Sequence, residues 1–177
     1  MSDPLIVSAL LADDAQRDLD EQRRRWFPRE RHVVGAHVTL FHALPGEELA
    51  AVADALRAAT DRPAPSVRVD EPFLLGGRSG GSGGVGYRLR SRALERVREE
   101  VANRFSGVLT DQDARRWRPH VTVQNKVDAE RARATLAEVE ATHAPYDTTV
   151  VGLALWHYRG GPWEAAGDWT FREPGSG

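Results

Sequence analysis

Residues 36–44 read AHVTLFHAL and residues 119–127 read PHVTVQNKV, and these two related stretches decide how the chain is organised. Each contains a His-x-Thr-apolar tetrad, at residues 37–40 in the first copy and at residues 120–123 in the second. Residues i and i+2 of an extended strand share a face, so each copy predicts a strand with an imidazole and a hydroxyl on one side. Two apolar side chains then face the other side. The chain therefore contains two equivalent predicted strands.

The segments around these two strands repeat in the same loose order. Each motif strand is followed by a predicted helix and preceded by an arginine-rich stretch with a tryptophan, at residues 23–26 and 115–118. Apolar spacing at three and four residues predicts the helices, and β-branched or alternating runs predict the strands. Ser91 and Asp128 are predicted to cap two of the helices. The predicted strands are 5–11, 36–44, 66–75, 87–90, 119–127, 146–158 and 163–171, and the predicted helices are 13–25, 46–60, 92–105 and 129–142.

This order predicts an α+β protein of the bilobal, pseudo-symmetric type. Two antiparallel-rich sheets would line a central cleft, with helices packed outside, and each lobe would contribute one motif strand. We expect residues 1–177 to form a single bilobal domain, because a chain of 177 residues suits one domain or two tightly joined lobes. The order alone leaves open which lobe holds the terminal strands.

A glycine-rich segment, residues 76–86, separates two of the predicted strands and is expected to be a flexible loop. It lacks the Gly-Lys-Ser/Thr ending of a phosphate-binding P-loop. Residues 77–84 could act as a lid over the cleft, but the sequence leaves the role of the loop open.

Composition narrows the classes of function. The chain has no cysteine, which excludes disulfides, thiolate metal sites and a cysteine nucleophile. A hydrophobic fraction of 41% is typical of a soluble protein, and no apolar run is long enough to span a membrane, so a cytoplasmic location is the default expectation. The formal net charge of −2 makes a general attraction for long polyanions unexpected. No protein partner is implied, and the oligomeric state is open.

The residue types of the tetrads point to acid-base chemistry on a phosphodiester. Two imidazoles and two hydroxyls around one small anion can move a proton to and from the reacting oxygens and hold the phosphate. This scheme requires no metal and no cofactor. His32, His37 and His42 recur every five residues, but an odd spacing puts His37 and His42 on opposite faces of one strand, so a metal site is not predicted there.

On these tetrads, their spacing and the bilobal order, the chain resembles the two-histidine phosphoesterase superfamily, and within it the 2′-5′ RNA ligase and cyclic phosphodiesterase group. The resemblance covers most of the chain. It implies two pseudo-symmetric lobes around a concave cleft, with His37 and His120 as the acid-base pair. Thr39 and Thr122 would hold non-bridging phosphate oxygens.

Five further residues are candidate substrate contacts. Phe41 and Gln124 are the next same-face positions after the two threonines, where a ring could stack on a base and an amide could bind a ribose or base. Core filling by Phe41 and a solvated rim position for Gln124 are equal alternatives. Arg118 belongs to the basic, aromatic stretch just before His120, and Tyr158 and Arg159 end a late predicted strand.

The sequence therefore predicts a metal-independent phosphoesterase acting on a 2′,3′-cyclic phosphate or a 2′-5′ linkage of RNA ends or small nucleotides. A reversible 2′-5′ RNA ligase and a non-catalytic module that binds nucleotides or RNA ends remain alternatives. The physiological substrate, the direction of the reaction and the division of acid and base roles between the two histidines are left open.

Overall fold

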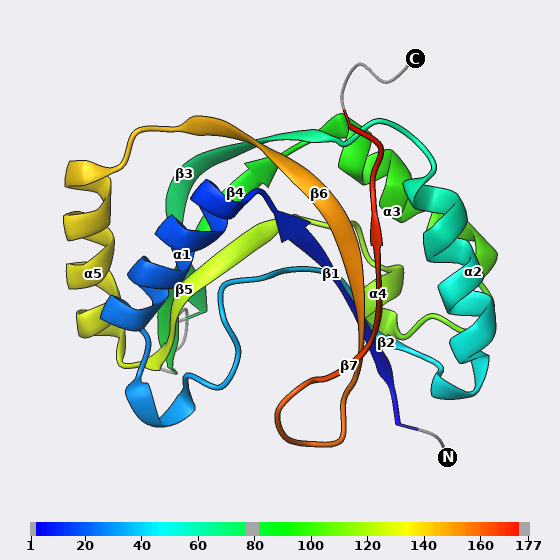
Figure 1. Cartoon of the computed structure of the whole chain (residues 1–177). Helices are drawn as coiled ribbons and strands as arrows, with labels where there is room; N and C mark the ends of the chain where they lie inside the picture. The colour runs from blue at the N-terminus through cyan, green and yellow to red at the C-terminus, as the bar shows by residue number, and fades with distance from the viewer. Residues whose placement is uncertain (1–2, 77–81, 174–177) are drawn as a thin grey trace.

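The computed structural model describes residues 3–76 and 82–173, and these form one antiparallel sheet with helices on its outside (Figure 1). Every pair of named strands in it is antiparallel. The elements are, in chain order, β1 (Leu5–Leu11), α1 (Asp13–Trp26), the 3₁₀ helix η1 (Arg29–Arg31), β2 (Val38–Leu44), the 3₁₀ helix η2 (Gly46–Glu48), α2 (Leu49–Thr60), β3 (Ser66–Gly76), β4 (Gly83–Arg90), α3 (Arg92–Arg104), α4 (Asp111–Ala114), β5 (His120–Val127), α5 (Ala129–Thr142), β6 (Tyr146–His157) and β7 (Glu164–Thr170).

The strand order is β2-β1-β6-β3-β4-β5, with β7 paired to β6. Exchanging β1 with β4, β2 with β5 and β3 with β6 gives the same order read backwards, which is the topology of a duplicated unit. The predicted α+β, pseudo-symmetric fold is confirmed. The two predicted sheets are joined through β6, whose first residues, 146–149, pair with β3 while the rest of the strand pairs with β1. In Figure 1 this long strand arches over both halves.

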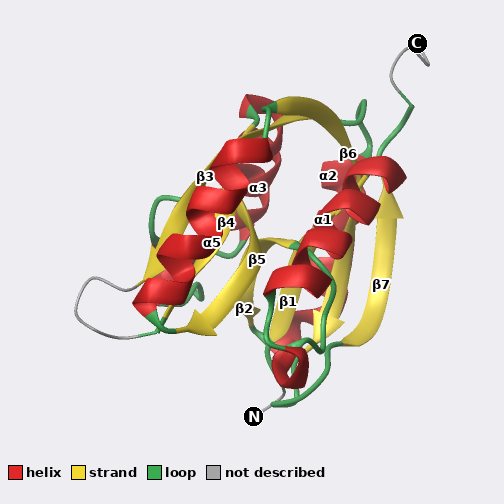
Figure 2. Ribbon diagram, turned by 90° about the vertical axis from the view of Figure 1, so that its left-hand side faces the viewer, coloured by secondary structure: helices red, strands yellow, loops and turns green. Residues whose placement is uncertain are grey.

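The helices obey the same exchange. Helix α1 follows β1 as α3 follows β4, and α2 follows β2 as α5 follows β5. One pair, α2 and α3, packs together on one side of the molecule. Helices α1 and α5 lie on the other side, where α1 contacts β5 and α5 contacts β3 and β4. Figure 2 shows these two helices running past each other with β5 visible between them.

Local chemistry explains most of the element boundaries. Leu5–Leu11 is buried along nearly its whole length, as expected for a strand covered on both faces. The predicted cap residues act as caps, because Ser91 Oγ accepts from the Leu94 amide at 3.1 Å and the Asp128 carboxylate accepts from the Arg131 amide at 2.8 Å. The short helix α4 was not predicted, since four residues carry no periodic signal.

The glycine-rich segment is the main correction to the predicted elements. Strand β3 runs on to Gly76 and β4 already begins at Gly83, so residues 83–86 are strand rather than loop. A Cβ at Gly84 would lie 2.0 Å from the carbonyl oxygen of Gln124, so only glycine lets β5 pair this closely. The predicted lid lies largely at residues 77–81, outside the described residues.

Candidate active site

Two strands at opposite ends of the sheet order, β2 and β5, contact each other and bring the two tetrads together. Strand β5 begins at His120, whereas β2 begins at Val38, so His37 lies directly before its strand and not inside it as predicted. Exposure alternates along both tetrads as the strand periodicity predicts. The half-buried residues are His37, Thr39, His120 and Thr122, and the buried residues are Val38, Leu40, Val121 and Val123.

The two histidines are held in the same way. Nδ1 of His37 lies 2.8 Å from the carbonyl oxygen of Gly35, and Nδ1 of His120 lies 2.9 Å from that of Arg118, two residues earlier in each case. A carbonyl can only accept, so Nδ1 carries the hydrogen in both rings. Each histidine is therefore left with Nε2 to accept or donate a proton.

The hydroxyls of Thr39 and Thr122 make no hydrogen bond with any described residue, so both can donate to a ligand. Their backbone carbonyls, by contrast, are held from the opposite half of the molecule. Arg23 of α1 donates to the Thr122 carbonyl at 2.7 Å, and Nε1 of Trp117 donates to the Thr39 carbonyl at 2.9 Å. The two predicted arginine-tryptophan stretches thus brace the two motif strands across the pseudo-symmetry axis.

A second arginine repeats the role of Arg23. Arg23 also donates to the Val34 carbonyl, in the segment before the first tetrad. Arg98 of α3 donates to the carbonyls of Leu40 and Asp113, the second of which precedes the other tetrad. Both arginines are buried, and each joins the segment that precedes the motif strand of its own half to the motif strand of the other half.

The environment of His37 favours its neutral form. Burial is the largest cause and lowers the pKa of His37 to about 4, although the bond to Gly35 raises it. Repulsion from Arg23, His120 and His42 lowers it further. Burial also lowers the pKa of Arg23, to about 10, so this side chain stays cationic at neutral pH.

Each histidine contacts an aromatic ring that sequence reasoning missed. The His37 and Trp163 ring centroids are 4.6 Å apart, and the edge-to-face pair of His120 and Phe73 has a centroid distance of 6.0 Å. Phe73 lies in β3, whereas Trp163 lies between β6 and β7, so the two rings come from different places in the two halves. Trp163 was predicted only as the first residue of the last strand, and that position carries no information about its distant partner.

Two of the five predicted substrate contacts are wrong in this structure. Phe41 is completely buried beneath the Arg98 guanidinium, 4.8 Å from its ring centroid. Gln124 is also fully buried, and its Nε2 donates to Thr135 of α5 at 2.7 Å. Both side chains fill the interior because helices cover the strand ends after the threonines. Core packing was the stated alternative for Phe41, whereas the burial of Gln124 contradicts its alternative, a solvated rim position, as well.

The other three predicted contacts lie on the surface. Arg118 is exposed and forms no ion pair with any described residue. The Tyr158 side chain is exposed as well. Arg159 is held in ion pairs with Asp3 at 3.1 Å and Glu164 at 3.0 Å, so a ligand would have to compete with both carboxylates. A substrate contact stays a prediction for each of them.

His42 is held by a buried carboxylate on its own side of the strand. The buried Asp113 carboxylate accepts from the His42 ring at 3.0 Å and from the backbone amides of His42 and Ala43. Within residues 3–76 and 82–173 no three histidine, aspartate or glutamate side chains are grouped so as to hold a metal ion. No helix in the same part of the chain is long and apolar enough to cross a membrane.

Comparisons with known proteins agree with this geometry. The family model described as "2′-5′ RNA ligase superfamily" matches residues 11–162. Escherichia coli LigT complexed with 3′-AMP is structurally similar, with a TM-score of 0.64, 16% identity and coverage of 98% of this chain and 100% of that chain. TT0787 of Thermus thermophilus has a TM-score of 0.63 at 16% identity, with 96% of this chain and 98% of that chain covered.

A more distant similarity extends to Usb1 of Kluyveromyces marxianus, with a TM-score of 0.52, 11% identity and coverage of 96% of this chain and 98% of that chain. At these identities the solved structures establish a shared fold. No curated protein matches the chain by sequence.

Proposed function

The chain belongs to the 2′-5′ RNA ligase superfamily, and from this premise we propose that it is a phosphoesterase for 2′,3′-cyclic phosphates or 2′-5′ phosphodiesters of RNA ends or small nucleotides. The observation that carries the proposal is the paired arrangement of the tetrads. Two histidines with Nε2 available and two threonines whose hydroxyls bond to no described residue lie on, or directly before, two strands that contact each other. This set matches the needs of proton transfer at one phosphate.

In hydrolysis of a 2′,3′-cyclic phosphate, one neutral imidazole takes a proton from water as the water oxygen attacks phosphorus. The other histidine, protonated, gives its proton to the ribose oxygen that leaves, so the ring of the cyclic ester opens and one phosphate monoester remains. The hydroxyls of Thr39 and Thr122 donate to the non-bridging oxygens, where negative charge increases in the transition state.

We assign the base to His37 and the acid to His120. Burial and the nearby cations hold His37 in the neutral form by lowering its pKa, and this is the form a general base needs at neutral pH. Trp163 packs against this ring, with 4.6 Å between the ring centroids. Crystal structures of E. coli LigT with 3′-AMP, ATP and phosphate support a nucleotide phosphate as the ligand class of this fold.

The decisive test is hydrolysis of 2′,3′-cyclic AMP by the purified protein in chelator, with His37→Ala and His120→Ala measured separately. We expect kcat/KM to fall by more than about 10²-fold in each variant, the usual effect of removing an acid or a base. His42→Ala is the matched control, because this imidazole lies in β2, five positions after His37, but bonds to Asp113. Full activity in both test variants would refute the proposal.

A substrate with an activated leaving group separates the two roles. A nucleoside 4-nitrophenyl phosphodiester needs no proton on its leaving oxygen, so it should restore much of the activity of His120→Ala and little of that of His37→Ala. The reverse pattern would exchange the assignments.

Ligation of two RNA halves is the second candidate function, favoured by the description of the matching family. The same groups can catalyse attack of a 5′-hydroxyl on the cyclic phosphate in place of water: the base takes the hydroxyl proton, the acid protonates the 3′-oxygen that leaves, and a 2′-5′ phosphodiester forms. Product analysis with one half ending in a 2′,3′-cyclic phosphate and the other in a 5′-hydroxyl distinguishes ligation from hydrolysis. Binding without any turnover would instead identify a non-catalytic module.

A further inference from the structure

A strongly basic pocket of about 730 Å³ lies where the end of α1, the end of β5 and the start of α5 meet. Five cationic side chains and two carboxylates line it, in a protein whose formal net charge is −2. The cations come from three separate parts of the chain and converge on one corner. They are Arg24, Arg25, Arg29, Lys126 and Arg131.

Most of these cations are not neutralised within the protein. Arg25 pairs with Glu138 at 3.5 Å, but the other four form no ion pair with any described residue. Arg24, Arg29, Lys126 and Arg131 are also exposed. Lys126 adopts a φ of 62°, a left-handed conformation in which glycine would be less strained than lysine. Clustered cations without partners repel one another unless an anion binds between them.

The fold itself does not require this basic corner. Its pseudo-symmetric equivalent, between the end of α3 and the start of α2, holds a pocket of about 530 Å³ whose charged residues are Glu48, Asp54 and Arg104. The pocket between these equivalent elements is therefore lined mainly by basic side chains in one half and mainly by acidic side chains in the other. Since both corners are built by equivalent elements, the cations are a property of this half and not of the architecture.

The basic pocket is connected to the candidate active site through Arg23. This buried side chain donates to the carbonyl of Thr122, and its guanidinium carbon lies 3.9 Å from the ring centroid of Phe27, which lines the pocket. Lys126 lies six positions after His120 along β5, or about 20 Å at the rise of an extended strand. One nucleotide cannot span that distance, whereas a strand of several nucleotides can.

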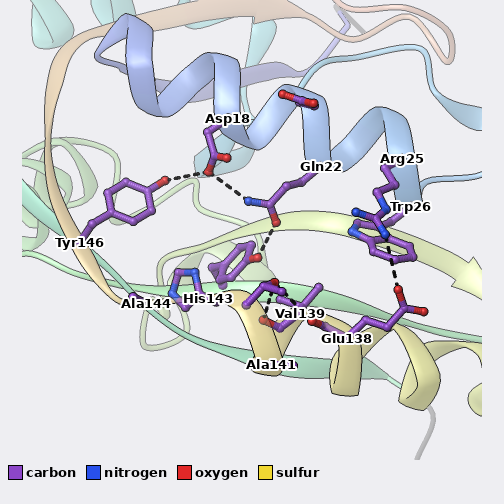
Figure 3. Close-up of a pocket in the computed structure, with 13 residues that line it drawn as sticks. Asp18, Gln22, Arg25, Trp26, Glu138, Val139, Ala141, His143, Ala144 and Tyr146 are labelled. Carbon is purple, nitrogen blue, oxygen red and sulfur yellow. Dashed lines mark hydrogen bonds and ion pairs between the residues drawn. The ribbon is translucent and has the colours of Figure 1, made fainter.

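A neighbouring pocket with mainly acidic side chains indicates on which side of the basic pocket an RNA strand would not bind. It lies farther along the gap between α1 and α5 and shares Arg25 with the basic pocket. Figure 3 shows Glu138 pointing to Arg25 across this gap, with Asp18 bonded to Gln22 and Tyr146 at the other end. Glu21 lines the same pocket, and its carboxylate forms no ion pair with any described residue. The carboxylates of this acidic pocket would repel the phosphates of an RNA strand, so the basic pocket is the favourable place for them to bind.

We propose that the corner formed by Arg24, Arg29, Lys126 and Arg131 is a second phosphate-binding site, which holds the backbone of a single-stranded RNA several nucleotides from the phosphate in the candidate active site. The proposal rests on the proposed function and narrows its substrate class, from small nucleotides and RNA ends to oligoribonucleotide ends. Arginine and lysine contacts to phosphates supply affinity without reading the base sequence.

The test is the salt dependence of binding to a fluorescein-labelled single-stranded octaribonucleotide ending in a 3′-phosphate, followed by anisotropy. The pocket variant is Arg29→Glu/Lys126→Glu/Arg131→Glu. The matched control, Arg92→Glu/Arg96→Glu/Arg104→Glu, changes the net charge equally on exposed arginines of α3. We expect the pocket variant to weaken binding by more than about 10-fold at low salt and to reduce the slope of log K against log salt by about 2. The control should keep most of the slope.

Equal losses in the two triple variants would overturn the proposal, because the effect would then be one of net charge. Hydrolysis of 2′,3′-cyclic AMP by a wild-type protein that does not bind the octanucleotide would overturn it and leave the proposed function intact. Octanucleotide binding that depends on the pocket, in a protein with no hydrolase or ligase activity, would support the site and refute the proposed function.

Lys126→Gly separates a binding role from a structural one. Glycine relieves the left-handed backbone, so we expect the midpoint of thermal unfolding to stay level or rise while octanucleotide affinity falls. Lower thermal stability with unchanged affinity would show that Lys126 serves the fold and would overturn its place in the site.

Discussion

At the scale of single residues, the chemistry of the site depends on which histidine nitrogen is free. Both His37 and His120 donate from Nδ1 to the carbonyl two residues earlier. The neutral ring then has its lone pair on Nε2, where a general base needs it. Both neutral rings therefore have the same tautomer, with the hydrogen on Nδ1. The assignment of one histidine as base and the other as acid rests on their different surroundings.

The low pKa of His37 predicts a pH dependence of stability. Burial lowers the pKa of this residue in the folded protein to about 4 from the ordinary 6.5, so the unfolded chain binds this proton first as pH falls. His37 therefore costs no stability above about pH 6.5 and an increasing amount as pH falls from there to 4. The cost is at most about 3 kcal/mol, because one pKa unit equals about 1.36 kcal/mol and the ring is partly exposed.

Urea unfolding of wild type and His37→Gln across about pH 4 to 7.5 measures this effect. The free energy difference between them should favour the variant increasingly below about pH 6.5 and become constant above it. A difference that does not change with pH would contradict the assigned environment of His37. Direct NMR titration of the His37 ring gives an independent value for the same pKa.

At the scale of elements, the pairing of β4 with β5 depends on a glycine. The sequence predicted a flexible loop for residues 76–86, yet Gly84 is a strand residue that allows close approach to the Gln124 carbonyl. We expect Gly84→Ala to reduce the free energy of unfolding by more than about 3 kcal/mol, since a Cβ there overlaps backbone that cannot move separately.

Gly107→Ala is the matched control for Gly84→Ala. A Cβ at Gly107 meets no atom within 4 Å, so the substitution should change stability by less than about 0.5 kcal/mol. Chemical denaturation of both variants checks the prediction. Equal stability of the two would mean that β4 and β5 can separate at no cost.

At the scale of the whole molecule, buried side chains that cross the pseudo-symmetry axis hold the two halves together. Arg23 donates to the carbonyl of Thr122, which lies 99 positions later in the chain, and it also donates to the carbonyl of Val34. Arg23→Met keeps an unbranched apolar side chain but removes the guanidinium and with it both charge-assisted hydrogen bonds. We expect a loss of about 2–4 kcal/mol in the free energy of unfolding.

Arg24→Met provides the comparison for Arg23→Met, because Arg24 is the next residue of α1 but is exposed and unpaired among the described residues. Its substitution should leave stability within about 0.5 kcal/mol of wild type. Urea titrations of the two variants would contradict the bracing role if their midpoints moved by the same amount.

The sequence by itself determined the local elements and the residue types of the candidate site. The alternation at residues 37–40 and 120–123 is a local property, because backbone geometry sends successive side chains to opposite faces wherever a strand forms. The helix caps at Ser91 and Asp128 were predictable for the same reason, since each bond spans only three residues.

Only the tertiary structure decided how the two tetrads face each other and what surrounds them. The braces from Arg23 and Trp117, and the contact of Trp163 with His37, all join residues far apart in the chain. The burial of Phe41 and Gln124 was likewise settled by packing, because period-two alternation places a residue on a face without saying what covers that face. Long-range packing turned two weak local motifs into one paired arrangement.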